Sequence, residues 1–181
     1  DITSTPITDV TSLGAVTLTH ILGSYYHISI NASKLLNGHT YVITVTLTKT
    51  YYQTAVVRIY VTVLTIPTVS SASKTSEELE WGLSTTIEIW YNDSRTLTPV
   101  PSPNNVTYAI FNGSELVNTY SLTAGPVGNW TLNIDTANMH LAPGVYTVYV
   151  YLEKAHYENK TIVITLTVKE IATYAYAQPA N

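Results

Sequence analysis

The sequence predicts an all-β protein made of two tandem β-sandwich domains, and three observations lead to that prediction. First, Thr, Val, Ile and Tyr are abundant while only 11% of the 181 residues are charged, a composition that favours strands over helices. Second, apolar and polar residues alternate along several stretches, with the period of a β-strand. Third, one pair of such stretches occurs twice, so the chain contains an internal repeat.

The repeated element is a hairpin. Alternating residues at 146–152 and 162–168 are joined by a polar turn, and the same pattern occurs at 41–47 and 57–63. The spacing is constant at 105 residues for Val45 and Val150, for Lys49 and Lys154, and for Tyr52 and Tyr157. A repeat of this length is the size of a small domain, so we expect two similar modules.

The first module is assigned to residues 1–68 and is expected to be incomplete. Strands are expected at 15–19 and 25–30, and Pro67 ends the module because proline cannot donate a ladder hydrogen bond. About forty residues precede the hairpin here, against about seventy in the second module. The strands equivalent to residues 77–91 are therefore expected to be missing.

The second module is assigned to residues 77–171, after a serine-rich linker at 69–76. Turn signals separate its expected strands, and the strongest of them is Asn112-Gly113. These strands are expected at 77–82, 85–91, 106–110, 115–122, 130–134, 146–152 and 162–168. About seven short strands with turns between them predict an immunoglobulin-like β-sandwich.

The tail, residues 172–181, allows two interpretations. Ile171 aligns with Ile66 at the repeat spacing, so the tail stands where a further repeat would begin. Alternatively, its alternation of bulky and small side chains suits a donor strand, because strand addition supplies main-chain hydrogen bonds along its whole length. The residues of this candidate donor strand are Thr173, Tyr174, Ala175, Tyr176 and Ala177.

Glycosylation sequons are the clearest chemical signal in the chain. Six asparagines satisfy the acceptor pattern, where about three are expected by chance: Asn31, Asn92, Asn105, Asn112, Asn129 and Asn159. One interpretation is that a threonine-rich chain creates sequons by composition alone. The other is that these positions carry covalent N-linked glycans, because nearly all of them fall in predicted turns or at strand ends.

Four tyrosines of the hairpins are expected to have distinct roles. Tyr41 and Tyr146 follow glycine-containing turns and are predicted to form structural tyrosine corners, in which the hydroxyl bonds back to the main chain. Tyr149 and Tyr151 alternate with the inward residues and should lie on the outer face. There they would stack across strands, contact sugars or line a subunit interface.

Several function classes find no support in the sequence. The five histidines, His20, His27, His39, His140 and His156, are scattered, so no metal site is expected. No nucleophile elbow or glycine-rich phosphate loop occurs, so we expect no catalytic residues, no cofactor and no enzyme activity. A net charge of −4 with only eight basic residues gives no electrostatic footprint for nucleic acid. No apolar run approaches the ~20 residues of a membrane span.

Five motifs together resemble the tandem immunoglobulin-like repeats of archaeal cell-surface proteins. They are Leu79-Glu80-Trp81-Gly82, Ile87-Glu88-Ile89-Trp90-Tyr91-Asn92-Asp93, Gly128-Asn129-Trp130-Thr131-Leu132-Asn133-Ile134-Asp135, Leu141-Ala142-Pro143-Gly144-Val145-Tyr146 and Lys154-Ala155-His156-Tyr157-Glu158-Asn159-Lys160. The resemblance covers the second module and the later half of the first. It implies an extracellular or cell-surface location, with neighbouring copies or adjacent repeats as partners.

Two functions fit this resemblance. The first is a structural building block of a filament or surface layer, with donor-strand complementation as a means of joining its copies. The second is a binding module, an adhesin or sensor ectodomain that recognises glycans or a cell surface.

Overall fold

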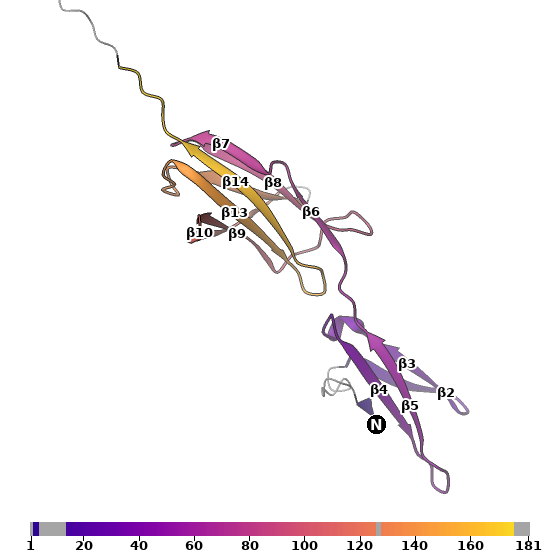
Figure 1. The fold of residues 1–181 in the computed structure, drawn as a ribbon. Coiled ribbons are helices and arrows are strands. Elements are labelled where there is room, and N and C mark those ends of the chain that lie inside the picture. Colours follow the sequence, from indigo (N-terminus) through magenta and orange to yellow (C-terminus); the bar gives the residue numbers. More distant parts are fainter. Residues whose placement is uncertain (1, 4–13, 126–127, 176–181) are drawn as a thin grey trace, which may run out of the picture. The chain divides into compact units, whose positions relative to one another are not determined.

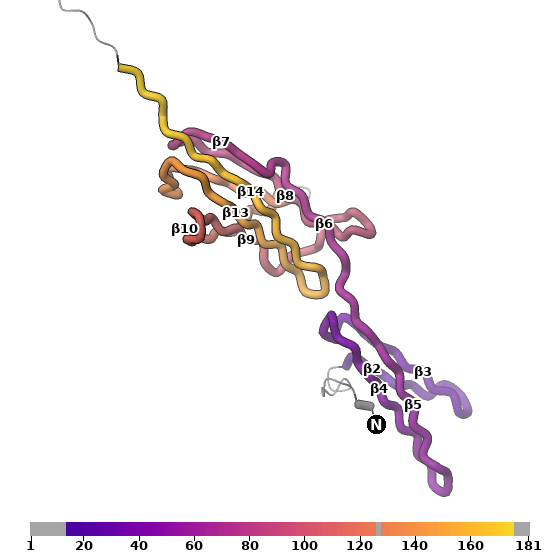
Figure 2. The backbone as a smooth tube through the Cα atoms, viewed as in Figure 1, coloured from indigo at the N-terminus to yellow at the C-terminus, as the bar shows by residue number. Residues whose placement is uncertain are grey.

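The computed structural model describes residues 2–3, 14–125 and 128–175, whose regular secondary structure is almost entirely β-strand (Figure 1). The chain divides into two compact units, Asp1–Ile66 and Pro67–Asn181. Each is built from short strands joined by tight turns, as the backbone trace also shows (Figure 2). No helix among the described residues is long and apolar enough to cross a membrane.

The second unit is an immunoglobulin-like β-sandwich of two sheets. One sheet has the strand order β10-β9-β13-β14-β7 and the other β11-β12-β8-β6. The strands are β6 (Thr68–Ala72), β7 (Ser76–Glu80), β8 (Ser84–Asp93), β9 (Asn105–Asn112), β10 (Glu115–Ser121), β11 (Thr123–Ala124), β12 (Trp130–Asp135), β13 (Gly144–Glu153) and β14 (Lys160–Lys169). Neighbouring strands are antiparallel except for β7 and β14, which are parallel.

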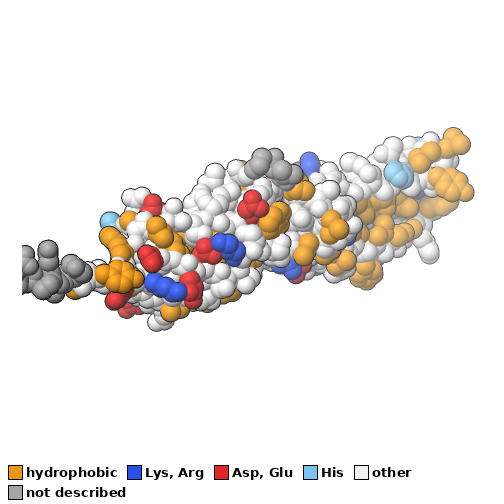
Figure 3. Space-filling model, turned by 90° about the horizontal axis from the view of Figure 1, so that it is seen from above, with side chains coloured by type: hydrophobic (Ala, Val, Ile, Leu, Met, Phe, Trp, Pro, Cys, Tyr) orange, Lys and Arg blue, Asp and Glu red, His pale blue; other side chains and the backbone are white. Residues whose placement is uncertain are grey.

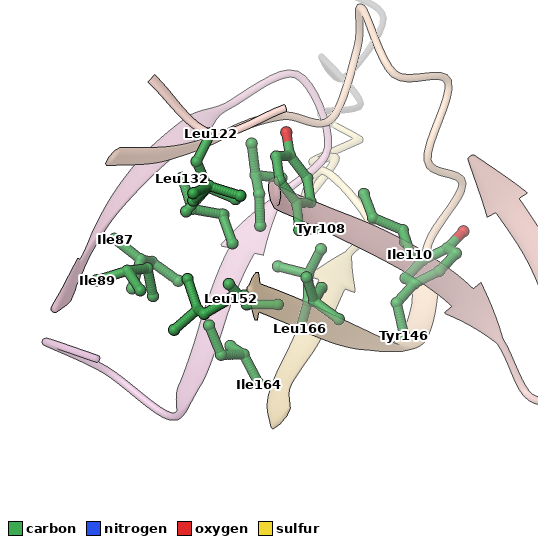
Figure 4. Packing of buried hydrophobic residues seen from close by; sticks show 14 of the residues in the cluster. Ile87, Ile89, Tyr108, Ile110, Leu122, Leu132, Tyr146, Leu152, Ile164 and Leu166 are labelled. Atoms are coloured by element: carbon green, nitrogen blue, oxygen red, sulfur yellow. The ribbon is translucent and has the colours of Figure 1, made fainter. Parts of the chain in front are cut away.

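The core of this unit lies between the two sheets (Figure 4). The β13–β14 hairpin contributes alternate residues from one side, among them Val148, Val150 and Ile164, each 0% exposed. Strand β8 contributes Ile87 and Ile89 from the other side, which are equally buried. Because side chains on a strand point alternately to opposite faces, the alternation in the sequence becomes one apolar face per strand.

Residues 69–76, expected to be a linker, instead belong to the second sandwich. Strand β6 pairs with β8, from Thr68 opposite Asp93 to Ala72 opposite Ile89, and β7 pairs with β14 in the other sheet. The segment is polar because both strands lie at sheet edges, where main-chain hydrogen bonds form on one side and apolar alternation is not required. The second unit therefore begins at Pro67.

The first unit contains a three-stranded sheet, β1-β4-β5, and a separate hairpin, β2-β3. Its elements are β1 (Ile2–Thr3), β2 (Val16–Leu22), β3 (Tyr25–Ile30), the short 3₁₀ helix η1 (Ala32–Lys34), β4 (Thr40–Leu47) and β5 (Ala55–Thr62). The buried residues of its small core are Ala15, Val16, Leu35, Tyr41, Ile43, Val45 and Val63.

The hairpins of the two units have the same register. Val45 lies opposite Val57 in the first unit, and Val150 lies opposite Ile162 in the second. Each residue of the second pair follows its equivalent in the first pair by 105 positions. Strand β3 corresponds likewise to β12, because both precede a turn that an Asn or Asp side chain caps. The described residues of the first unit contain no counterpart of β6, β7 or β8.

The strand register predicts unequal effects for neighbouring substitutions in β13. Val150→Asp places an unpaired charge in the core and should lower the free energy of unfolding by about 3 kcal/mol or more. Tyr151→Ser, on the outer face, should cost about 1 kcal/mol. All three tryptophans lie in the second unit, so tryptophan fluorescence during urea denaturation reports on this unit. Equal losses for the two variants would show that the register is wrong.

Candidate assembly site

Strands β1, β2, β3 and β5 of the first unit each have one edge without a partner among the described residues, and the edges of β3 and β5 have paired equivalents in the second unit. Strand β3 pairs only with β2, and β5 pairs only with β4. In the second unit the corresponding edges are paired, since β12 binds β8 and β14 binds β7. An unpaired edge presents a row of N–H and C=O groups that can accept another strand.

The side chains beside these edges are less buried than their counterparts. Ile164 and Leu166 of β14 are 0% exposed, whereas the equivalent residues of β5, Ile59 and Val61, are only half-buried. The same difference separates β12 from β3: Leu132 and Ile134 are fully buried, while Ile28 and Ile30 are half-buried. The core of the first unit is therefore incompletely covered by the residues described.

The outer surface of the first unit is also unusually apolar. Figure 3 shows hydrophobic side chains crowded over this unit, while acidic and basic side chains are interspersed over the second. The large exposed hydrophobic residues of the first unit are Leu18, Ile21, Leu22, Tyr25, Tyr26, Leu36, Tyr51, Tyr52, Val56, Val57, Tyr60 and Leu64. Contiguous apolar surface of this kind marks interaction sites in soluble proteins. The repeat spacing predicts which strands are absent from the described part of this unit, but no local sequence pattern predicts this surface.

The candidate donor strand is only partly described. Thr173, Tyr174 and Ala175 are exposed and belong to no strand, and the Tyr174 side chain is 95% exposed. Tyr176 and Ala177 lie outside the described residues. The described part of the tail thus presents an extended, accessible segment with a large aromatic side chain.

Both expected tyrosine corners have the predicted kind of hydrogen bond. The Tyr146 hydroxyl donates to the main-chain oxygen of Ala142 at 2.8 Å. The Tyr41 hydroxyl accepts a hydrogen bond from the Leu36 main-chain N–H, also at 2.8 Å. Each tyrosine is almost completely buried, so these bonds fix the turn that enters the central hairpin of its unit.

The six sequons differ in accessibility. Asn31, Asn112 and Asn159 are exposed, and Asn92 and Asn105 are half-buried. Asn129 is 8% exposed, and its side-chain oxygen is buried without a hydrogen-bond partner. Because a glycan needs an accessible amide nitrogen, the expectation of a glycan at Asn129 does not fit this fold. The sequence pattern could not show this, since burial depends on which strand faces the core.

Among the described residues, no three His, Cys, Asp or Glu side chains gather into a cluster that could hold a metal ion. Asp93 and Asp135 have carboxylates that could contribute oxygen ligands to a metal ion, but both already accept hydrogen bonds within their own turns. Asp93 accepts hydrogen bonds from the Arg95 side chain at 3.1 and 2.7 Å, and Asp135 accepts from the main-chain N–H groups of Ala137 and Asn138. These contacts stabilise turns.

An aromatic row crosses the outer face of the sheet that contains β9 and β13. Phe111 meets Tyr149 edge-on with ring centroids 5.5 Å apart, and Tyr149 stacks on Tyr151 at 6.5 Å. All three side chains are half-buried. The Phe111–Tyr149 contact joins β9 to β13, and cross-strand aromatic pairs of this kind stabilise a sheet.

The accessibility of the sequons predicts which of them carry sugar. Mass spectrometry of protein from its native source should find glycans on peptides containing Asn112 and Asn159, because both side chains are exposed at turns. The peptide containing Asn129 should be unmodified and serves as the internal control. Unmodified Asn112 and Asn159 peptides, or sugar on Asn129, would contradict this prediction.

The Asp93–Arg95 contact predicts a measurable acid dependence. The Arg95 side chain, followed by its main-chain N–H, lowers the pKa of Asp93 from 3.8 to about 2. Since the folded pKa is below the unfolded one, the carboxylate stabilises the fold above pH 3.8, and this contribution is lost as the pH falls towards 2. In an Arg95→Gln variant, NMR titration should show the pKa of Asp93 rising towards 3.8. Arg58→Gln, in the first unit, is the matched control, and an unchanged Asp93 titration in Arg95→Gln would refute the assignment.

No protein-family model and no curated protein sequence matches the chain.

Solved structures match at low identity. One contains domains 4 and 5 of the S-layer protein SbsC, with 14% identity, a TM-score of 0.43, and coverage of 84% of this chain and 66% of that chain. Another contains SbsC domains 1–6, with 12% identity, a TM-score of 0.42, and coverage of 98% and 21%. Fibronectin(III)-like modules of Clostridium thermocellum CbhA match with 8% identity, a TM-score of 0.39, and coverage of 88% and 76%. The present chain thus spans about a fifth of the longer S-layer structure, and these similarities concern the fold alone.

Proposed function

We propose that the protein is a non-catalytic structural building block of a glycosylated extracellular assembly, either a filament or a surface layer. Its copies, or adjacent repeats, join by strand addition to the first unit. The observation that carries this proposal is the pair of unpaired edges, on β3 and β5, beside a half-buried core. The exposed sequons support a location at the cell surface or outside the cell.

An added strand would stabilise the first unit in two ways. Its main chain would satisfy the N–H and C=O groups along an open edge, as β8 does for β12 in the second unit. Its side chains would cover the half-buried residues Ile28, Ile30, Ile59 and Val61. Completing the burial of four such side chains contributes about 1 kcal/mol each, in addition to the main-chain hydrogen bonds of the added strand.

Within this chain, the segment best suited to act as the added strand is the tail of a neighbouring copy. Residues 171–175 are exposed and occupy no strand in their own copy, so they are available for pairing. Tyr174 and Tyr176 alternate with Thr173, Ala175 and Ala177, which gives one bulky face and one small face. The bulky face matches an uncovered apolar core, and the small face would point to solvent.

A second candidate function is a glycan-binding module. The observation that favours it is the aromatic row formed by Phe111, Tyr149 and Tyr151, whose half-buried rings lie on an outer sheet face. Sugar rings stack on such surfaces through their apolar faces. This function requires no contact between copies and is therefore separable from the first by experiment.

Removal of residues 172–181 tests the proposed assembly. The purified full chain should elongate into polymers visible by electron microscopy, and the shortened chain should remain monomeric because the donor strand is absent. A chain in which the same residues are replaced by an equally long Gly/Ser segment controls for tail length. Tryptophan fluorescence and circular dichroism verify that the units remain folded.

Polymers that persist after the deletion would reject donation by the tail. A full chain that stays monomeric and binds glycans would replace assembly with the second candidate function.

A further inference from the structure

The first unit contains a cavity at the ends of its two hairpins. It is a shallow, largely open depression with a volume of about 310 Å³. The side chains that give it chemical character are Tyr26, Leu47, Lys49, Tyr52 and Gln53. The Lys49 ammonium group lies 4.9 Å from the centre of the Tyr52 ring, so the wall combines aromatic surface with a positive charge.

The equivalent place in the second unit is occupied by a tyrosine. Tyr91, the last apolar inward residue of β8, is 1% exposed, and its hydroxyl donates a hydrogen bond to the main-chain oxygen of Glu158 at 2.8 Å. Burial raises the pKa of this hydroxyl, so it remains a neutral donor. The Thr68 hydroxyl donates to the same oxygen at 2.7 Å, which anchors the start of β6 there.

Several residues that line the cavity have counterparts in the core of the second unit or at the Tyr91 hydrogen bond. Leu152 belongs to the same core cluster as Tyr91, and Trp130 and Tyr157 pack against that cluster. In the first unit, Leu47, Tyr52 and Gln53 stand 105 residues before Leu152, Tyr157 and Glu158. Tyr26 precedes the inward Ile28 by two residues as Trp130 precedes the inward Leu132, a spacing of 104. Tyr26 and Tyr52 are 48% and 69% exposed, because no side chain of the described residues fills the space between them.

We propose that this cavity is a socket for the side chain of Tyr176 from the tail of a second copy. This proposal rests on the proposed function and specifies its contact. The incoming strand would take the place of β8 beside β3, with its tyrosine where Tyr91 would be. The tyrosine hydroxyl would donate to the main-chain oxygen of Gln53, the equivalent of Glu158.

The pattern of the tail supports this occupant. In β8 the inward apolar residues are Ile87, Ile89 and Tyr91, with the tyrosine the last of them before the buried Asp93. In the tail, Ala172, Tyr174 and Tyr176 have the same spacing, and a tyrosine is again last. A strand that runs as β8 does, antiparallel to its neighbour, brings this last residue to the hairpin ends where the cavity lies. The socket therefore determines both the direction and the register of the added strand.

Peptide binding tests the socket separately from assembly. A fluorescent peptide with the sequence of residues 170–181 is titrated against the full chain, and binding is followed by anisotropy. A second peptide carries Ala175→Tyr together with Tyr176→Ala, which keeps the composition but moves the tyrosine to the opposite face of the strand. We expect the second peptide to bind about tenfold or more weakly.

A matched pair of chain variants tests the location. Ser24→Trp fills the cavity, which Ser24 lines, and should weaken binding of the native peptide by a similar factor. Thr17→Trp places the same side chain at an exposed position of β2 that does not line the cavity, and should leave binding unchanged. Protection of the β3 main-chain amides from hydrogen exchange should appear only when the native peptide is bound.

Equal binding of the two peptides, or full binding to Ser24→Trp, would overturn the socket. Polymers that form normally with Tyr176→Ala would also overturn it while leaving assembly by strand addition intact. If the chain neither binds the peptide nor polymerises, both the socket and the proposed function are wrong.

Discussion

The pairing of β8 with β12 is the interaction on which the closed sandwich depends. Strand β8 lies between β12 and β6, so it supplies main-chain hydrogen bonds on both edges. It also delivers three buried side chains, Ile87, Ile89 and Tyr91, to the core opposite the β13–β14 hairpin. Where no equivalent strand is described, in the first unit, the residues that would face it are half-buried. The difference between the two units follows largely from this one strand.

The hairpin itself does not require that strand. The β4–β5 hairpin keeps the register of β13–β14, and its tyrosine corner is formed through Tyr41. Ile43 is 0% exposed even though Ile59 and Val61 are half-buried. The first unit is therefore organised before any strand is added. A preorganised acceptor loses little conformational entropy on binding, which favours specific addition of a strand over non-specific association.

The strands of the core were predictable from the sequence, and so were the edge strands β7 and β10, but the edge strand β6 was not. Alternation identified β8, β12, β13 and β14 because each has one face buried, which forces a period of two. Strand β6 is polar and lies at an edge, so its serine-rich sequence resembled a linker. The contact between Tyr91 and Glu158 joins residues 67 positions apart through a main-chain oxygen, which leaves no trace in local pattern. The cavity in the first unit is likewise formed by residues of two separate hairpins, so local pattern does not predict it.

The distribution of sequons would leave the strand edges of the first unit free to accept a strand. Only Asn31 lies in that unit, and it follows directly after the end of β3, so a glycan there would leave the strand edge itself free. The other accessible sequons lie in the second unit. With charged residues at only 11% of the chain, electrostatic repulsion does little to keep copies apart. Glycans on the second unit would prevent its surface from associating, and the apolar edges of the first unit would remain as the surface through which copies meet.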